Sequence, residues 1–212
     1  MKFDTITSDL QSLADDGIKY AKKLGAEQAE IFVSSHQQTN VRNQSGMIDA
    51  KDGSNDGIGV RVAIGKKLGF AATSGLTKES VEHAIKEALS VVKSVKEDNI
   101  GFETFAAKLK PGKDGIIDDA IVALTSEDIV KNANDIFLDA KNYDERIIGP
   151  FAQCQAIYGG HAVANTEGVS AASRITALVL VTSVTAAEGD NRKTAFDFLP
   201  VNERKSAVYK VT

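Results

Sequence analysis

The segment from 57 to 74 reads Gly57-Ile-Gly-Val-Arg-Val-Ala-Ile-Gly-Lys-Lys-Leu-Gly-Phe-Ala-Ala-Thr-Ser74, and it decides the fold. Residues 58–64 are rich in β-branched side chains, which alternate with other residue types along the segment. Gly65-Lys66-Lys67 is a tight connection, after which residues 68–73 form the second strand of the pair. This order predicts a β-hairpin. The strand candidates before it are sequential and their links are short, so we expect an antiparallel meander.

Helical spacing flanks the hairpin on both sides. Apolar residues recur every three or four positions over 6–24, which predicts a first helix with one buried face. Thr77 is placed to cap a second helix over 77–95. Ser126 is placed to cap a third helix, whose apolar stripe runs over 129–140. We therefore expect about three helices packed on the sheets.

Further strands are expected in two blocks. The first runs over 29–41, turns at 43–46, continues over 47–51 and enters a loop at 51–57 that is rich in Gly, Asp, Ser and Asn. The second block comprises 147–158, a turn at Gly159-Gly160, and then the strands 161–164, 169–172, 175–186 and 195–199. The fold class is α+β, with mainly antiparallel sheets in which a helix precedes a β-meander.

A weak internal echo suggests that this helix-then-meander unit is duplicated. Asn43-Gln-Ser-Gly46 resembles Asn165-Thr-Glu-Gly168, and each follows a helix and an alternating strand. The alternative, that Asn-x-x-Gly is common turn chemistry, remains open. The predicted organisation is one domain over 1–200, with sub-units 1–95 and 125–200 joined by a long loop, and a tail over 201–212.

Composition excludes several classes of protein. The chain has 212 residues, of which 42% are hydrophobic and 25% charged, so it can bury a core. A net charge of −4 argues against a broad basic face for nucleic acid. No stretch of about 20 apolar residues could span a membrane, and the N-terminus lacks the apolar region of a secretory signal. We expect a cytoplasmic protein.

The residue types that carry most chemistry are few and scattered. The three histidines, His36, His83 and His161, form no helical metal pair, and each is read as solvated or hydrogen-bonded. The only cysteine, Cys154, lies in an apolar strand and is read as a buried thiol. An acidic loop cluster, Asp114, Asp118 and Asp119, is read as solvated rather than as a cation site.

Arg61 has the most unusual surroundings. Alternation places it on one strand face with Gly57, Gly59, Ala63 and Gly65. Small neighbours leave room for another backbone or a carboxylate to approach the guanidinium. The alternative is an exposed arginine on a solvated sheet face.

The segment 57–74, followed by the capped helix 77–95, resembles the amino-terminal domain of the TldD/PmbA family, a metallopeptidase-related group once described as modulators of DNA gyrase. Three further segments resemble the family in the same order, and the similarity extends to about Asp190. They are Gly25-Ala-Glu-Gln-Ala-Glu-Ile-Phe-Val33, Ser45-Gly-Met-Ile-Asp49 and Val163-Ala-Asn-Thr-Glu-Gly-Val169.

The resemblance implies a role on the substrate side. In the metallopeptidase branch, a His-Glu-x-x-x-His helix and a later cysteine bind the metal in a second, carboxy-terminal domain. This sequence has no His-Glu pair. We therefore expect no catalytic or metal-binding residue in this chain, no cofactor, and zinc only in a partner or a missing domain. Whether the chain takes part in an enzyme stays undecided.

The family pattern also suggests which residues contact substrate. Its amino-terminal sheet helps to enclose a groove in which an extended peptide lies against strand edges. The matching positions here are Gly57, Gly59, Arg61, Gly69 and Phe70. The expected partners are that peptide and a TldD/PmbA-like subunit in a homo- or hetero-oligomer, with no direct nucleic-acid contact and no membrane contact.

Three main interpretations remain open at this point, and some other binding module is the remaining alternative. The first is an amino-terminal part that contributes peptide binding and subunit association to a proteolytic system, without its own catalytic centre. The second is a truncated or split product of a full-length metallopeptidase homologue with no independent activity. The third is an independent enzyme built on Cys154 or His161.

Overall fold

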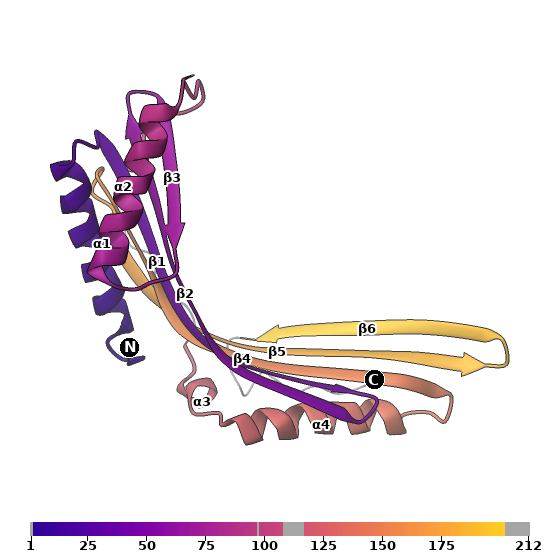
Figure 1. The fold of residues 1–212 in the computed structure, drawn as a ribbon. Helices are drawn as coiled ribbons and strands as arrows, with labels where there is room; N and C mark the ends of the chain where they lie inside the picture. The colour runs from indigo at the N-terminus through magenta and orange to yellow at the C-terminus, as the bar shows by residue number, and fades with distance from the viewer. Residues whose placement is uncertain (1, 97, 108–116, 202–212) are drawn as a thin grey trace. The chain divides into compact units, whose positions relative to one another are not determined.

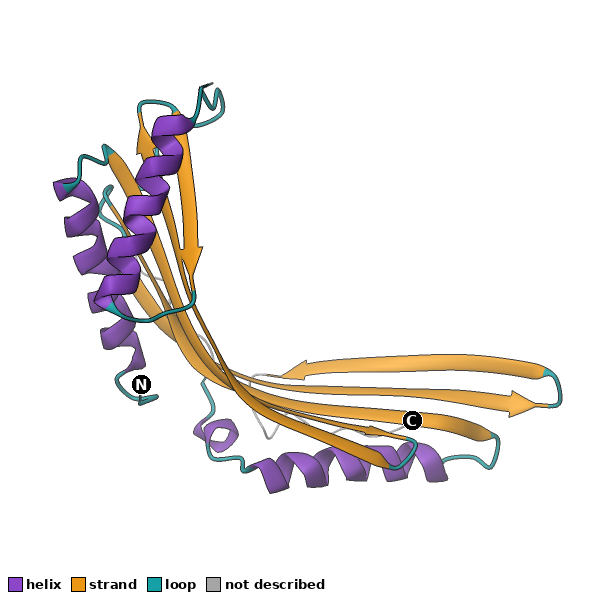
Figure 2. Cartoon of the chain, in the orientation of Figure 1, coloured by secondary structure: helices purple, strands orange, loops and turns teal. Residues whose placement is uncertain are grey.

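The computed structural model describes residues 2–96, 98–107 and 117–201. Figures 1 and 2 show helices laid against long antiparallel strands. The helices and strands are, in chain order, α1 (Ile6–Lys23), β1 (Gln28–Gln44), β2 (Met47–Ile64), β3 (Lys67–Thr73), α2 (Lys78–Ser94), α3 (Asp119–Val122), α4 (Ser126–Asn142), β4 (Ile147–Asn165), β5 (Ser170–Glu188) and β6 (Asn191–Val201).

The strands form one six-stranded sheet in the order β3-β2-β1-β4-β5-β6. The outer pairs, β2 with β3 and β5 with β6, are antiparallel, and each is closed by a two-residue loop that starts with a glycine at positive φ, Gly65 or Gly189. Glycine at the first loop position is typical of hairpin turns. The expected α+β class with mainly antiparallel strands is confirmed.

Contacts divide the chain into two units. Unit 1 contains Met1–His36, Asn55–Gly115 and Gly159–Arg174, and unit 2 contains Gln37–Ser54, Ile116–Tyr158 and Ile175–Thr212. The long strands contribute to both, so each of the sequence ranges 1–95 and 125–200 has residues in both units. Each unit has its own hydrophobic core.

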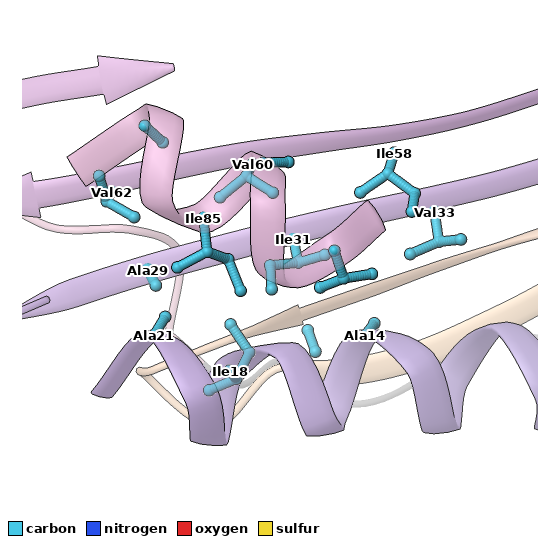
Figure 3. Close-up of a cluster of buried hydrophobic side chains, with 14 of the residues drawn as sticks. Ala14, Ile18, Ala21, Ala29, Ile31, Val33, Ile58, Val60, Val62 and Ile85 are labelled. Carbon is cyan, nitrogen blue, oxygen red and sulfur yellow. The ribbon is translucent and has the colours of Figure 1, made fainter. Parts of the chain in front are cut away.

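In unit 1, α1 and α2 cover one face of the sheet. Ala14, Ile18 and Ala21 of α1 are buried with β1 and β2 side chains such as Ile31 and Val60, as Figure 3 shows. Alternate residues of each strand enter this core, as the period of two requires. Gly17 has a low helix propensity, but α1 packs so closely on the sheet there that a Cβ would lie 2.5 Å from Ile31 Cδ1.

In unit 2, α4 covers one face of the sheet. Its buried residues Ile129 and Phe137 share a core with Cys154 and Leu180 of the strands. Helix α4 begins with a capping box, in which Thr125 Oγ1 accepts from Asp128 N at 3.2 Å and Asp128 Oδ2 accepts from Thr125 N at 3.0 Å. The cap is therefore Thr125 and not Ser126, which we expected from the sequence.

The second strand block differs most from the prediction. Gly159-Gly160 is not a turn, because β4 runs unbroken from Ile147 to Asn165. A Cβ at Gly159 would lie 2.1 Å from Ser35 O, and one at Gly160 would lie 3.0 Å from Ile6 Cγ2. The two glycines let other groups approach the strand closely, which is their second common role in sheets.

Other boundaries also change. The predicted loop at 51–57 is part of β2, the strands 169–172 and 175–186 join into β5, and the short strand 195–199 is the longer β6. A one-turn helix, α3, lies in the connection expected to be irregular, so the described chain has four helices rather than three. Of the predicted tail, residues 202–212 lie outside the described residues.

Candidate functional site

The sheet face of unit 1 that points away from α1 and α2 carries most of the residues predicted from the sequence. We call it the open face, and it is formed by the alternate residues that the helices do not cover. From β1 it includes Glu30, Phe32, Ser34 and His36; from β2, Gly57, Gly59 and Arg61; from β3, Phe70; and from β4, His161.

Phe70 lies on the open face beside bare backbone. In the hairpin register it is directly opposite Arg61, and its side chain is 59% exposed. A Cβ added to Gly59 would meet Phe70 Cε2 at 3.7 Å, so the phenyl ring lies next to a position that has no side chain. Gly57 continues the bare strip, with only Ser34 Oγ within 4 Å of its would-be Cβ. An exposed aromatic ring over glycines offers apolar contact to a ligand.

Arg61 is held in place by two groups, Glu30 and Phe105. Its guanidinium forms an ion pair with Glu30 of β1, and it lies 5.2 Å from the centre of the Phe105 ring. Phe105 itself is 4% exposed and packs edge-to-face on Phe102. The arginine therefore has a carboxylate partner within the chain, which fits the expectation that a carboxylate approaches it.

Gly69 does not belong to the open face. It lies opposite Val62, on the side that α2 covers, and a Cβ there would lie 2.0 Å from Ala88 O. Its role is structural, because only glycine lets α2 approach β3 this closely. The structure thus brings Gly57, Gly59, Arg61 and Phe70 together and places Gly69 behind them.

The segment 102–107 closes one end of the open face. Gln28 Oε1 of β1 accepts hydrogen bonds from Thr104 Oγ1 and from Phe105 N, both at 3.0 Å, and Asn165 Nδ2 donates to Ala106 O at 2.8 Å. These bonds join residues far apart in the sequence and hold Phe105 under Arg61. No local sequence pattern indicated this segment.

At the other end of the open face lie two histidines and an aromatic ring. Phe32, 47% exposed, stacks on His161 with ring centres 5.9 Å apart, and His161 Nε2 hydrogen-bonds Ser173 Oγ at 2.8 Å. Partial burial lowers the pKa of His36, His161 lowers it further, and Asp56 opposes the shift. His36 therefore binds a proton less readily than a free imidazole.

The outer edge of β3 borders the open face. Ile64 and Lys67 flank the hairpin loop and form a hydrogen-bonded pair. From there along the strands, opposed residues alternate between pairs with and pairs without backbone hydrogen bonds. Leu68, Phe70 and Ala72 consequently direct their N–H and C=O groups away from β2. Within the described ranges, β3 has only β2 as a neighbour, so this edge is free to pair with an extended segment.

Cys154 and Asp118, two further predicted groups that the structure describes, have structural roles. Cys154 is fully buried in unit 2, and burial raises the pKa of its thiol to about 12, although a hydrogen bond with Asn132 opposes the shift. A thiol of that kind is not a nucleophile at neutral pH. Asp118 caps α3, with its side chain accepting from Ala120 N at 2.9 Å, while Asp114 lies outside the described residues.

The residues present do not fit a zinc site of the kind that the family suggests. Over residues 2–96, 98–107 and 117–201, no three His, Cys, Asp or Glu side chains lie close enough together to hold a metal ion. Zinc in structural and catalytic sites takes at least three such ligands. The same ranges contain no helix with the length and hydropathy needed to cross a membrane.

Comparison with known proteins shows which family and which solved structures the chain is similar to. Residues 29–92 match the family model for PmbA/TldA metallopeptidase domain 1. Among solved structures the chain is similar to a candidate modulator of DNA gyrase from Bacteroides thetaiotaomicron, with a TM-score of 0.81, 20% identity, and coverage of 94% of this chain and 46% of that one. The chain is also similar to a candidate modulator of DNA gyrase from Thermotoga maritima, with a TM-score of 0.74 and 18% identity. That similarity covers 92% of this chain and 44% of the other.

A third similar structure is TldE from Thermococcus kodakarensis, with a TM-score of 0.79, 16% identity, and coverage of 90% of this chain and 43% of that one. No curated protein matches the sequence. At these identities the structural likenesses establish the fold, and the chain spans less than half the length of each of these proteins. The family match over residues 29–92 and the shared fold together support the resemblance to an amino-terminal TldD/PmbA domain.

Proposed function

We propose that the open face of unit 1 and the free edge of β3 bind an extended peptide for a TldD/PmbA-type proteolytic system. The chain contributes substrate binding and subunit association, and a partner or a further domain supplies the catalytic zinc. The observation that carries this proposal is the exposed Phe70, which lies beside the bare Gly57–Gly59 strip on a strand whose outer edge has no described neighbour.

The peptide is expected to add to β3 as another strand. Its backbone would pair with the outward N–H and C=O groups of Leu68, Phe70 and Ala72, which gives affinity without sequence preference. Alternate peptide side chains would then lie on the open face next to Phe70, where apolar contact selects hydrophobic residues. Arg61 is already paired with Glu30, so it positions Phe70 and the face rather than recruiting an acidic peptide.

The proposal is tested with a fluorescein-labelled, unstructured decapeptide that contains leucine at alternate positions, measured by fluorescence anisotropy. Replacing Phe70 by serine should weaken binding at least about fivefold, because exposed aromatic anchors at an interface centre contribute more than 1 kcal/mol. Tyr143→Ser is the matched control, since Tyr143 is also an exposed aromatic residue (61%) but belongs to unit 2. Equal affinity of Phe70→Ser and the unmodified chain would contradict the proposal.

A second variant pair tests the bare strip. Gly59→Val adds a branched side chain beneath the Phe70 ring, whereas Gly53→Val adds the same group to β2 where nothing lies within 4 Å. We expect Gly59→Val to displace the ring and weaken peptide binding, and Gly53→Val to bind normally. Circular dichroism confirms that both variants fold.

The alternative function, a truncated or split product without independent activity, stays a separate hypothesis. The nucleotide sequence downstream decides it, because a continuation that encodes His-Glu-x-x-x-His in another frame would favour a split gene. Peptidase activity of this chain alone with added zinc would contradict both interpretations.

A further inference from the structure

Strand β6 presents a long free edge in unit 2. It pairs with β5 from Glu188↔Asn191 to Leu178↔Val201, and it is the last strand in the sheet order. Over the described residues no strand lies on its other side. Such an edge is a template for pairing with another chain unless it is short, bent or covered.

The hairpin register shows which backbone groups face outward. Glu188 and Asn191 flank a two-residue loop and form a hydrogen-bonded pair, so Arg192, Thr194, Phe196 and Phe198 occupy the alternate positions whose N–H and C=O groups point away from β5. Two contacts agree with this assignment. Thr194 Oγ1 lies 2.8 Å from Thr185 Oγ1, as in a close pair without backbone bonds, and Phe198 N donates to Asp197 Oδ1 at 2.8 Å instead of to β5.

Pro200 marks the end of the usable edge. It occupies the next outward position, and a proline there has no N–H to donate to another strand. The stretch that can pair is therefore 192–198. Phe196 and Phe198 lie on one face of this stretch and are 79% and 53% exposed. Uncovered apolar side chains beside a free edge are typical of an interaction surface.

The charges along β6 select a partner. If a second copy of β6 runs antiparallel to the first with Ala195 at the centre, Lys193 of each copy lies opposite Asp197 of the other. Centring on Thr194 or on Phe196 would instead place Lys193 opposite Ala195 or Leu199. Only the Ala195 register forms two opposite-charge cross-strand pairs, which stabilise a sheet.

The same register also gives favourable partners to the other residues of the stretch 192–198. Thr194 of each copy lies opposite Phe196 of the other, and both have outward backbone groups, so they form hydrogen-bonded pairs. Arg192 lies opposite Phe198, where a guanidinium can stack on the ring. Ala195 meets its own counterpart at the twofold axis, where a small side chain allows close approach.

We propose that two copies of this chain associate by antiparallel pairing of their β6 edges over residues 192–198, with the twofold axis at Ala195. This extends the subunit association of the proposed function to a defined surface and a defined partner. It is independent of the peptide site, which belongs to unit 1.

Charge reversal tests the register in solution. Sedimentation equilibrium of the full chain should show a monomer–dimer equilibrium, which a small edge-pairing interface places at roughly micromolar or weaker affinity. Asp197→Lys and Lys193→Asp should each weaken dimerisation at least about tenfold, because both attractive pairs become repulsive. Asp139→Lys, the same charge change on the exposed surface of α4, is the matched control and should leave the dimer unchanged.

Mixing the two variants gives the decisive measurement. Asp197→Lys carries lysine at both positions and Lys193→Asp carries aspartate at both, so a one-to-one mixture should form a heterodimer through two restored pairs. Recovery of dimer in the mixture supports the proposed register. A chain that is monomeric at every concentration, or single variants that dimerise as well as the unmodified chain, would overturn the proposal.

A cross-linking experiment gives an independent readout. Cβ atoms of directly opposed residues in a sheet lie about 4.5–5.5 Å apart, close enough for a disulfide after a small adjustment. Ala195→Cys should form an intermolecular disulfide under mild oxidation, whereas Thr194→Cys should not, because residue 194 lies opposite residue 196. The native Cys154 is buried and does not compete. Equal cross-linking of both variants would contradict the register.

Discussion

Single residues on the open face have roles that their chemistry alone does not show. Gly57 and Gly59 matter for the side chains they lack, Arg61 matters as the partner of Glu30 and Phe105, and Phe70 is the exposed apolar group beside them. Gly69 shares the same sequence segment but acts on the other face. At this scale, function and stability are separated by which side of a strand a residue occupies.

Gly69 should be the most sensitive position of the hairpin for stability. A methyl group there would lie 2.0 Å from Ala88 O and 2.8 Å from Val92 N, both backbone atoms of α2. We expect Gly69→Ala to lower the free energy of unfolding by about 1–3 kcal/mol or more, as for overpacked cores. Urea denaturation measures the change, and Gly53→Ala, which meets no atom within 4 Å, is the control. Equal stability of the two variants would show that α2 can shift freely.

His36 should make stability depend on pH below neutrality. Burial and His161 lower its pKa in the folded state, with Asp56 opposing, so the unfolded chain binds the proton more readily. The stabilising contribution is present above the unfolded pKa of about 6.5 and is lost as the pH falls toward the folded pKa. Stability should therefore fall from pH 7 toward acid, and less so in His36→Gln. Thermal unfolding from about pH 7 to 5 tests this, with the exposed His83 mutated to glutamine as the control.

At the scale of elements, caps and turns define where the chain changes direction. Helix α4 begins with the reciprocal Thr125–Asp128 bonds, and the β1–β2 turn is held by Asn43 Oδ1, which accepts from Gly46 N at 3.1 Å. Asn165 Oδ1 likewise accepts from backbone N–H groups of its turn, but from Glu167 N and Val169 N, both at 3.0 Å. The echo between the two Asn-x-x-Gly segments is thus a shared way of holding a turn.

The position of the α4 cap predicts that Thr125 contributes more to stability than its neighbour Ser126. Thr125→Ala removes the side-chain acceptor for Asp128 N and should cost about 1 kcal/mol of stability, the usual value for an N-cap. Ser126→Ala removes only an exposed hydrogen bond to Asp52, 3.0 Å long, and should cost less than half as much. Chemical denaturation of both variants compares them, and an equal or larger cost for Ser126→Ala would place the cap where the sequence pattern suggested it.

At the scale of the whole molecule, the two proposed surfaces belong to different units. The peptide site is built by β1, β2, β3 and β4 in unit 1, and the pairing edge by β6 in unit 2. Each unit has its own core, so a surface change in one need not disturb the other.

This separation predicts independent effects. Asp197→Lys should weaken dimerisation at least about tenfold and leave the affinity for the labelled decapeptide within about twofold. Phe70→Ser should weaken peptide binding at least about fivefold and leave dimerisation within about twofold. Measuring anisotropy and sedimentation on both variants completes the comparison. Loss of both activities in either variant would show that the two surfaces are coupled.

The sequence by itself determined what depends on neighbours along the chain. The apolar stripes of α1, α2 and α4 and the β2–β3 hairpin follow from periodicity and turn residues, which act over a few positions. The resemblance of 57–74 to a TldD/PmbA amino-terminal domain rested on the same local order. It was confirmed, and so was the α+β class.

Only the tertiary structure decided what depends on distant atoms. Gly159 and Gly160 have the composition of a turn, yet they continue β4 because Ser35 and Ile6 approach them from elements far away in the sequence. Phe105 lies under Arg61 because Gln28 and Asn165 hold the segment around it. The open face exists because α1 and α2 both pack on the opposite side of the sheet, and a one-dimensional pattern does not say which face of a strand the helices will cover.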